Sequence, residues 1–447
     1  LPILRLAALC ALLLLAACGG KQIPPRDGIP SPHLGTIRDM RTFPQDLTVF
    51  AQQAGADTPL LDSQAQAEQD ARFNRIFFGP WDMRKTSIRK RDVEIYFRKA
   101  KGYKYGDVRW TQDEWDAMRA NAGLKSFPNT AMYGITVRNA DLREMPSHTP
   151  RFSEPTPDPR INPFDYFQYS LLPVGTPVFI AHTSRDGNWY YVETPVAAGW
   201  VDANDIGIVD EAFEASYKTG SYVAVLRDNV PLPGSLAGQV NIGTVLPLAP
   251  SQSDNTRLAV LVPVKNGSRA TVVTLTLAHE DAAIKPLPMT PAQVALIGNV
   301  MMGQRYGWGG MFGDRDCSAL TRELLTPFGI WLPRNSLSQA RSGRRIMLDG
   351  MSIKEKEKAI LRDGVPFLTL VWLRGHIMLY VGPYKGRPAI FHNVWGVRTV
   401  EGASDNERFV IGRAVVSSIT PGSELRNLYR TTTFGDRVNS ITVLGGR

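Results

Sequence analysis

Apolar residues recur at helical spacing in the first third of the chain. Segments 44–55 and 62–78 carry an apolar side chain at every third or fourth position, and a shorter pattern over residues 111–123 stops at Gly123. These periodicities predict that residues 36–130 form a mostly helical domain. The aromatic residues of this region are expected to pack a core rather than bind a ligand: Phe73, Phe77, Phe78 and Trp81.

The pattern changes at Met132 to short alternating runs separated by turn residues, which is typical of β-strands. Two such runs, 175–184 and 189–195, flank an Asp-Gly turn and predict a β-hairpin. Similar runs recur further along, so we expect two small β-barrels in tandem at 131–215 and 216–286, the second a diverged copy of the first. Two small barrels in tandem suggest that they bind a ligand or partner. The alternative is that they only space the flanking domains apart.

Residues 287–447 mix helical and strand patterns, as expected of an enzyme domain. Apolar runs around His376 and His392 predict two strands, and the segment 382–388 between them is rich in turn residues. A hairpin centred near its middle would place the two imidazoles opposite each other on one face. The polar tail from Pro421 carries no clear pattern.

The first 20 residues contain one basic residue, an apolar run and then small residues, which is typical of a secretory signal. The run Leu15-Ala16-Ala17-Cys18 has the pattern at which bacterial lipoprotein signals are cut and the cysteine is acylated. We therefore expect a signal peptide over 1–17, a lipidated Cys18 and a Gly- and Pro-rich tether over 18–35. An ordinary cleaved signal with an incidental cysteine is the alternative.

This reading places the protein in the bacterial envelope, anchored in a lipid bilayer and facing the periplasm. Gly19 stands where an aspartate retains some lipoproteins at the inner membrane, so the outer membrane is favoured. The chain has 447 residues and a formal net charge of +9, from 51 Lys and Arg against 42 Asp and Glu. The positive charge could attract the protein to an anionic envelope polymer, or it could serve only solubility. A nucleic-acid partner is not expected for an exported chain.

Composition excludes several other classes. Hydrophobic residues make up 43% of the chain, which argues against wholesale disorder, and no stretch of 18 apolar residues follows residue 20. The Gly-rich segment GWGGMFGD lacks the lysine of a phosphate loop, and the six histidines have no close-spaced Cys or His partners for zinc. No metal or cofactor is therefore expected.

Cys317 is the only cysteine after residue 18. It follows a Gly-rich segment and opens a predicted helix, where unpaired amides and the helix dipole stabilise an anion. We therefore expect a lowered thiol pKa and a nucleophilic role, with the amides available to hold an oxyanion. One histidine of the predicted hairpin would act as base and the other would orient it. A buried, inert thiol is the alternative.

The residues around these three positions resemble the NlpC-type cell-wall cysteine peptidases. Cys317 in DCS, His376 in GHIMLYVG and His392 in FHNVW match the catalytic positions of that family. YGWGG upstream matches its Tyr-x-Trp-Gly-Gly segment, and PRNS matches its Pro-Arg-Asp-(Ser/Ala) segment. Two departures are Asn335 in place of Asp and Ala319 in place of a usual Gly.

The resemblance implies a multidomain fold with a mostly helical N-terminal clip, two small SH3-like β-barrels and a C-terminal α+β papain-like catalytic domain. It also implies hydrolysis of the γ-D-glutamyl–diamino acid bond in peptidoglycan stem peptides. We expect the protein to be a monomer. The first barrel of similar proteins closes one end of the cleft and restricts it to stems with a free N-terminus, and Tyr166 and Tyr169 lie in its expected loop.

The resemblance suggests four residues that hold the substrate: Asp316, Ser318, Ser336 and Tyr306. For Asp316 a helix N-cap is an equal alternative, and for Tyr306 packing beneath the site is another. Two other functions remain open at this point. One is an amidase or acyltransferase on the same papain-like scaffold, and the other is a peptidoglycan-binding lipoprotein without catalysis.

Overall fold

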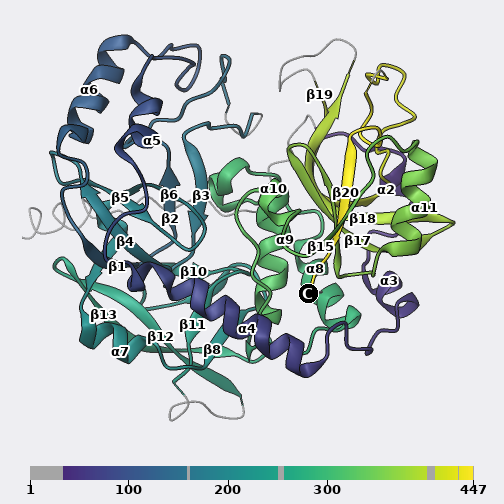
Figure 1. The fold of residues 1–447 in the computed structure, drawn as a ribbon, viewed down its shortest axis with the longest axis horizontal. Coiled ribbons are helices and arrows are strands. Elements are labelled where there is room, and N and C mark those ends of the chain that lie inside the picture. Colours follow the sequence, from purple (N-terminus) through teal and green to yellow (C-terminus); the bar gives the residue numbers. More distant parts are fainter. Residues whose placement is uncertain (1–33, 159–161, 250–255, 400–407, 431, 446–447) are drawn as a thin grey trace, which may run out of the picture. The chain divides into compact units, whose positions relative to one another are not determined.

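The computed structural model describes residues 34–158, 162–249, 256–399, 408–430 and 432–445 (Figure 1). The predicted signal peptide, Cys18 and most of the predicted tether lie outside these ranges. Within them, no helix is both long enough and apolar enough to cross a membrane.

Helices dominate the N-terminal region, as predicted. The elements are α2 (Asp39–Thr42), α3 (Thr48–Gln53), α4 (Ser63–Phe78), η1 (Gly79–Asp82), α5 (Lys90–Glu94), η2 (Ile95–Phe97), α6 (Gln112–Ala122) and η3 (Leu124–Ser126). The Thr111 side chain caps α6 by accepting the Glu114 N–H, and Gly123 ends it at a φ of 63°. The predicted start and end of this helix are therefore confirmed.

Short strands and two small helices follow. They are β1 (Met132–Thr136), β2 (Ala140–Arg143), β3 (Gln168–Leu172), β4 (Pro177–Thr183), β5 (Trp189–Glu193), β6 (Ala198–Asp202), η4 (Ala203–Asp205), β7 (Ile206–Val209), α7 (Glu211–Tyr217), β8 (Tyr222–Val225), β9 (Val230–Leu232), β10 (Gly238–Val240), β11 (Val245–Pro247), β12 (Arg257–Asn266), β13 (Arg269–Ala278) and β14 (Ala282–Lys285). Strands β4 and β5 form the predicted hairpin.

The strands β1–β7 form a first β region, and the strands β8–β11 with β14 form a second. The long hairpin β12–β13 joins these two β regions. It pairs with the sheet of β1–β7 through Arg269 and Ile208, and its inward side chains pack with β8 and β11 in a second core. Residues of α4 and η1 pack against α7 and the first β region, so Phe73, Phe78 and Trp81 do serve a core.

The C-terminal region surrounds a six-stranded sheet. Its elements are α8 (Pro291–Met301), η6 (Trp308–Gly313), α9 (Cys317–Leu325), η7 (Thr326–Phe328), α10 (Ser336–Gln339), β15 (Arg344–Met347), α11 (Ile353–Asp363), β16 (Thr369–Leu373), β17 (His376–Tyr384), β18 (Arg387–Arg398), β19 (Arg408–Ser417) and β20 (Val438–Val443). The strand order is β15-β20-β16-β17-β18-β19, so the patternless tail supplies an interior strand, and β19 is an edge. Helices α8 and α9 cover one face of the sheet and α11 covers the other (Figure 1).

The β17–β18 hairpin makes the two histidines cross-strand neighbours on one face, as predicted, but not in direct opposition. Leu379 pairs with Phe391, and the register shifts between Tyr380 and Gly382. Continuing this register sets His392 across from Met378 rather than from His376. The two histidines are therefore diagonal neighbours on the same face, two positions out of direct opposition, which is still within reach of ring side chains.

The N-terminal helices contribute to the core of the C-terminal region. Helix α3 packs on α8 and β17. Phe43, Leu47 and Phe50 lie in the same buried cluster as Leu320 of α9 and Ile377 of β17. The N-terminal helices and the C-terminal sheet thus share one core, and Leu34–Arg447 form a single compact unit.

Candidate active site

Cys317 is the first residue of α9 and only 7% of its surface is exposed. Asp316 caps the helix by accepting the Ala319 N–H at 2.8 Å. The backbone N–H groups of Ile377 and Ser318 donate toward the thiol. Because Ile377 directly follows His376, these contacts bring the sulfur to the start of β17, where His376 is the first residue.

The expectation of a lowered thiol pKa is wrong for this structure. Burial, together with the negative charge of Asp316, raises the pKa of Cys317 to about 12. The amides of Ile377 and Ser318 and the charge of Arg334 oppose this rise without cancelling it. Removing water from the sulfur therefore outweighs the favourable helix terminus, and the resting thiol is neutral.

His376 and His392 form a buried pair, with 2.8 Å between His376 Nε2 and His392 Nδ1. Beyond them, His392 Nε2 lies 2.9 Å from Ser417 Oγ. Burial, with a smaller contribution from Arg437, lowers the pKa of His376 to about 3. Burial and the neighbouring His376 lower the pKa of His392 well below its usual value. Both imidazoles are neutral at pH 7, as a general base must be.

Asp316 and Ser318 belong to a buried hydrogen-bonded cluster with Arg334. Arg334 Nη1 lies 3.1 Å from Asp316 Oδ1 and 2.7 Å from Ser318 Oγ, and the Ser318 hydroxyl donates to Asp316 at 3.0 Å. Burial alone would raise the pKa of Asp316, but the charge and hydrogen bonds of Arg334 hold it below its usual value. The N-cap role considered for Asp316 is confirmed, and both side chains are already engaged within the chain.

Tyr306 and Ser336 occupy different surroundings. Tyr306 is 9% exposed and packs between Phe164 and Trp395, with ring centroids 5.9 and 6.0 Å away. Burial, followed by the adjacent Cys317, raises the pKa of its hydroxyl well above its usual value. Ser336 is half-buried at the start of α10. Asn335 caps that helix by accepting the Ser338 N–H at 2.8 Å, which an aspartate would do equally well.

The first β region directly contacts two segments near Cys317, the loop that contains Gly309 and the segment that contains Arg334. Gln168 Nε2 donates to the Gly309 carbonyl at 3.3 Å, and Arg334 Nε donates to Ser170 Oγ at 3.0 Å. The ring of Tyr166 lies 6.0 Å from that of Trp308, which is 36% exposed. The sequence suggested that Tyr169 lies in a loop, but it lies in strand β3. One wall of the site therefore comes from β3.

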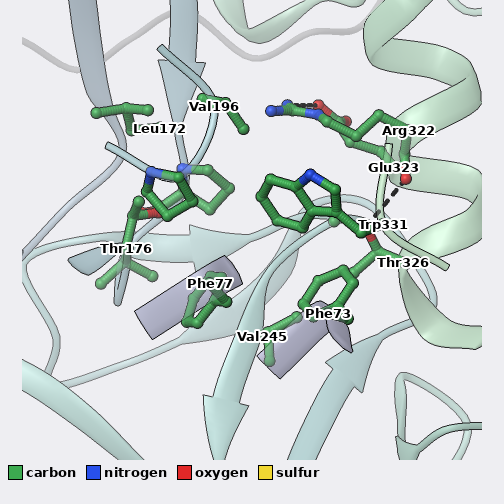
Figure 2. Close-up of a pocket in the computed structure, with 14 residues that line it drawn as sticks. Phe73, Phe77, Leu172, Thr176, Val196, Val245, Arg322, Glu323, Thr326 and Trp331 are labelled. Carbon is green, nitrogen blue, oxygen red and sulfur yellow. Dashed lines mark hydrogen bonds and ion pairs between the residues drawn. The ribbon is translucent and has the colours of Figure 1, made fainter. Parts of the chain in front are cut away.

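Two cavities flank α9, and neither is lined by Cys317 or the two histidines. Figure 2 shows the first, between α4, the β regions and α9. Its walls are mainly apolar, including Phe73, Phe77 and Trp331, and its cation Arg322 already pairs with Glu323 at 3.0 Å. Among the described residues, no group of three or more His, Cys, Asp or Glu side chains could hold a metal ion.

Several residues of the site were not predicted from the sequence. Ser417 reaches His392 from β19, and Phe434 covers both imidazoles with its ring centroid 5.4 Å from that of His376. Arg334 lies in the PRNS segment, which signalled its presence but not its ion pair with Asp316. Nothing in the local pattern around Ser417 or Phe434 indicates a role, because both reach the site only through distant strand and loop contacts.

Comparison with known families identifies three modules. Residues 7–127 match the NLPC_P60 stabilising domain, N term, residues 150–202 match the SH3 domain of SH3b1 type, and residues 303–413 match the NlpC/P60 family. The third match contains Cys317, His376 and His392. The resemblance found in the sequence, and the multidomain fold it implied, are confirmed.

A solved structure of an NlpC/P60 endopeptidase from Photobacterium damselae subsp. piscicida has the same fold. It aligns with a TM-score of 0.76 at 24% identity, over 94% of this chain and 99% of that one. An NlpC/P60 family protein from Bacillus cereus aligns with a TM-score of 0.41 at 17% identity, over 61% and 81% of the two chains. No curated protein matches the chain at a significant level.

Proposed function

Because residues 303–413 match the NlpC/P60 family and residues 7–127 match its stabilising domain, we propose that the protein hydrolyses the γ-D-glutamyl–diamino acid bond of peptidoglycan stem peptides. The observation that carries this proposal is the hydrogen-bonded pair His376–His392 together with the Cys317 thiol, which lies at a helix start and contacts the amide of Ile377, the residue after His376. A nucleophile, a neutral base and a group that orients the base are the requirements of covalent acyl transfer.

In the proposed mechanism, Cys317 attacks the isopeptide carbonyl while His376 accepts the thiol proton. Because thiol and imidazole are both neutral at rest, this proton moves as the carbon–sulfur bond forms. Backbone N–H groups at the start of α9 stabilise the oxyanion. His376 then gives the proton to the leaving amine, and water, deprotonated by His376, hydrolyses the thioester to release the acid and the free thiol.

Cleavage of a defined tetrapeptide tests this function. L-Ala-γ-D-Glu-diaminopimelate-D-Ala is incubated with the chain from Lys21 onward and with its Cys317→Ala variant, and the products are identified by mass spectrometry. Release of L-Ala-D-Glu by the wild type alone supports the proposal. An N-acetylated copy of the peptide shows whether the free amine is read, and no cleavage of either peptide contradicts the proposed specificity.

The two histidines are separated by the same assay. His376→Ala removes the base, whereas His392→Ala removes only the group that orients it, so we expect the larger loss of kcat for His376→Ala. Equal losses in the two variants would contradict this assignment of roles.

We further propose that the protein is lipid-anchored through Cys18 in the envelope and faces the periplasm, with the outer membrane favoured. The support is the sequence of the first 20 residues alone. Cys18→Ser is expected to move the protein from the membrane pellet to the soluble fraction. Continued sedimentation of the variant with membranes would contradict the anchor.

A further inference from the structure

The hydrogen bonds behind His392 have a fixed direction. Ser417 Oγ lies 2.8 Å from the carbonyl oxygen of Ser418, which can only accept a hydrogen bond. The single hydroxyl proton of Ser417 is therefore donated to Ser418. It follows that Ser417 Oγ accepts from His392, so the Nε2 atom of His392 carries its proton.

The proton position on His392 also fixes the proton position on His376, the proposed base. A neutral imidazole has one donor and one acceptor nitrogen, so the Nδ1 atom of His392 must accept. At 2.8 Å its donor is the Nε2–H of His376. The lone pair of neutral His376 is then on Nδ1, the nitrogen left to take the Cys317 proton. This series of hydrogen bonds ends on the Ser418 carbonyl, which cannot take up a proton, so the positive charge formed during attack stays on the imidazoles.

Residues of the N-terminal region bind the backbone next to Ser417, where this series of hydrogen bonds ends. Ser417 and Ser418 lie at the end of the edge strand β19, and both are fully buried. The Asp39 carboxylate of α2 accepts from Ser418 N at 2.8 Å and from Ser418 Oγ at 2.6 Å. The Gln45 side chain forms two hydrogen bonds with the Val416 backbone, at 2.9 and 3.0 Å, as a neighbouring strand would.

We propose that Ser417 is a positioning residue that fixes the tautomers of His392 and His376, and that Asp39 and Gln45 keep it in place. The N-terminal region thereby acts on the base itself, through Ser417, beyond its share of the hydrophobic core. This inference rests on the proposed function, because it assigns His376 Nδ1 as the acceptor of the thiol proton.

Nitrogen-15 NMR of the histidine rings tests the tautomers without any need for activity. The full chain is labelled at histidine, and long-range proton–nitrogen spectra are recorded at pH 7, with His376→Asn and His392→Asn providing the assignments. In the wild type we expect protons on Nε2 of both rings. A wild-type His376 protonated on Nδ1 overturns the proposal, even if the tetrapeptide is cleaved.

Ser417→Ala removes the acceptor of a buried N–H, so the opposite tautomer of both rings should gain population. We expect kcat for the tetrapeptide to fall about 10- to 100-fold, the range typical when an outer partner of a functional histidine is lost. KM should stay unchanged because Ser417 is fully buried and cannot touch the substrate. Unchanged tautomers together with unchanged kcat overturn the proposal.

Two further variants separate positioning from general destabilisation. Gln45→Met removes both hydrogen bonds to Val416 at similar side-chain length, and should change the same ring signals to a smaller extent. Ser440→Ala removes another buried serine hydroxyl of the same sheet, one that binds Arg345, and should leave the ring signals and kcat unchanged. If Ser440→Ala lowers kcat as Ser417→Ala does, the effect is structural and the proposal fails. If the wild type cleaves no peptide, the proposed function fails while the spectra still decide the tautomers.

Discussion

At the scale of single residues, burial sets the charges of Cys317 and His376, the proposed nucleophile and base. It raises the pKa of the Cys317 thiol and lowers the pKa of His376, so both groups are neutral over a wide pH range. A thiolate–imidazolium pair would need the opposite shifts. The attack is therefore expected to use general-base assistance rather than a preformed thiolate.

Alkylation by iodoacetamide measures this resting state. With a thiol pKa of about 12, the thiolate fraction of Cys317 grows about tenfold for each pH unit between about pH 6 and pH 9, and the alkylation rate should grow with it. Cys317 is the only thiol in the chain from Lys21 onward, so the signal is unambiguous. Free glutathione, which approaches its plateau near pH 9, serves as the control.

A plateau of the Cys317 rate below pH 8 would contradict the neutral thiol. Slow alkylation at pH 7 does not argue for a non-catalytic binding protein, because a buried catalytic thiol behaves in the same way. Fast alkylation at pH 7 would restore the lowered thiol pKa that the helix start alone predicts.

At the scale of elements, the start of α9 depends on one buried ion pair. Arg334 neutralises Asp316, and both side chains are at least nine-tenths buried. Arg334→Met would leave the carboxylate buried without its counter-charge, so we expect a loss of about 3–5 kcal/mol in the free energy of unfolding. Urea unfolding followed by circular dichroism measures this loss.

Arg362→Met is the matched control for that substitution. Arg362 pairs with Asp363 on the surface of α11, with 72% of its side chain exposed. Its free energy of unfolding should stay close to that of the wild type, because exposed ion pairs contribute little. Equal stability of the two variants would mean that the Arg334–Asp316 pair does not stabilise α9.

Elements with strong local signals could be predicted from the sequence, and those fixed by distant contacts could not. Helix α6 has its cap and its terminal glycine in place, and Cys317 stands at a recognisable helix start. The hairpin of β17 and β18 was predicted, but no local pattern reveals the bulge between Tyr380 and Gly382. Strand β20 becomes an interior strand only because it lies between β15 and β16. Ser417 owes its role to the same kind of long-range pairing.

At the scale of the whole molecule, the modules share charges as well as core residues. Arg315 of the catalytic region is buried and pairs with Asp228 of the second β region at 2.7 Å, and also with Glu323. Burial lowers the pKa of Arg315, but the charges of Glu323 and Asp228 outweigh this and raise it overall. A catalytic region without its neighbours would lose one of these two carboxylates.

A truncation series shows whether the catalytic region folds without the rest. The chain from Leu287 onward lacks Phe43, Leu47 and Phe50, each no more than 7% exposed in the shared core. At roughly 2 kcal/mol for each buried side chain, their loss removes about 6 kcal/mol, comparable to the whole stability of an average domain. It also lacks Asp228, Asp39 and Gln45. We therefore expect the chain from Leu287 to lack cooperative unfolding in urea, while the chain from Leu34 retains it. Cooperative unfolding of the shorter chain at a similar urea midpoint would contradict this expectation. It would show that the C-terminal region folds without the N-terminal helices and without the hydrogen bonds of Asp39 and Gln45 to residues 416–418.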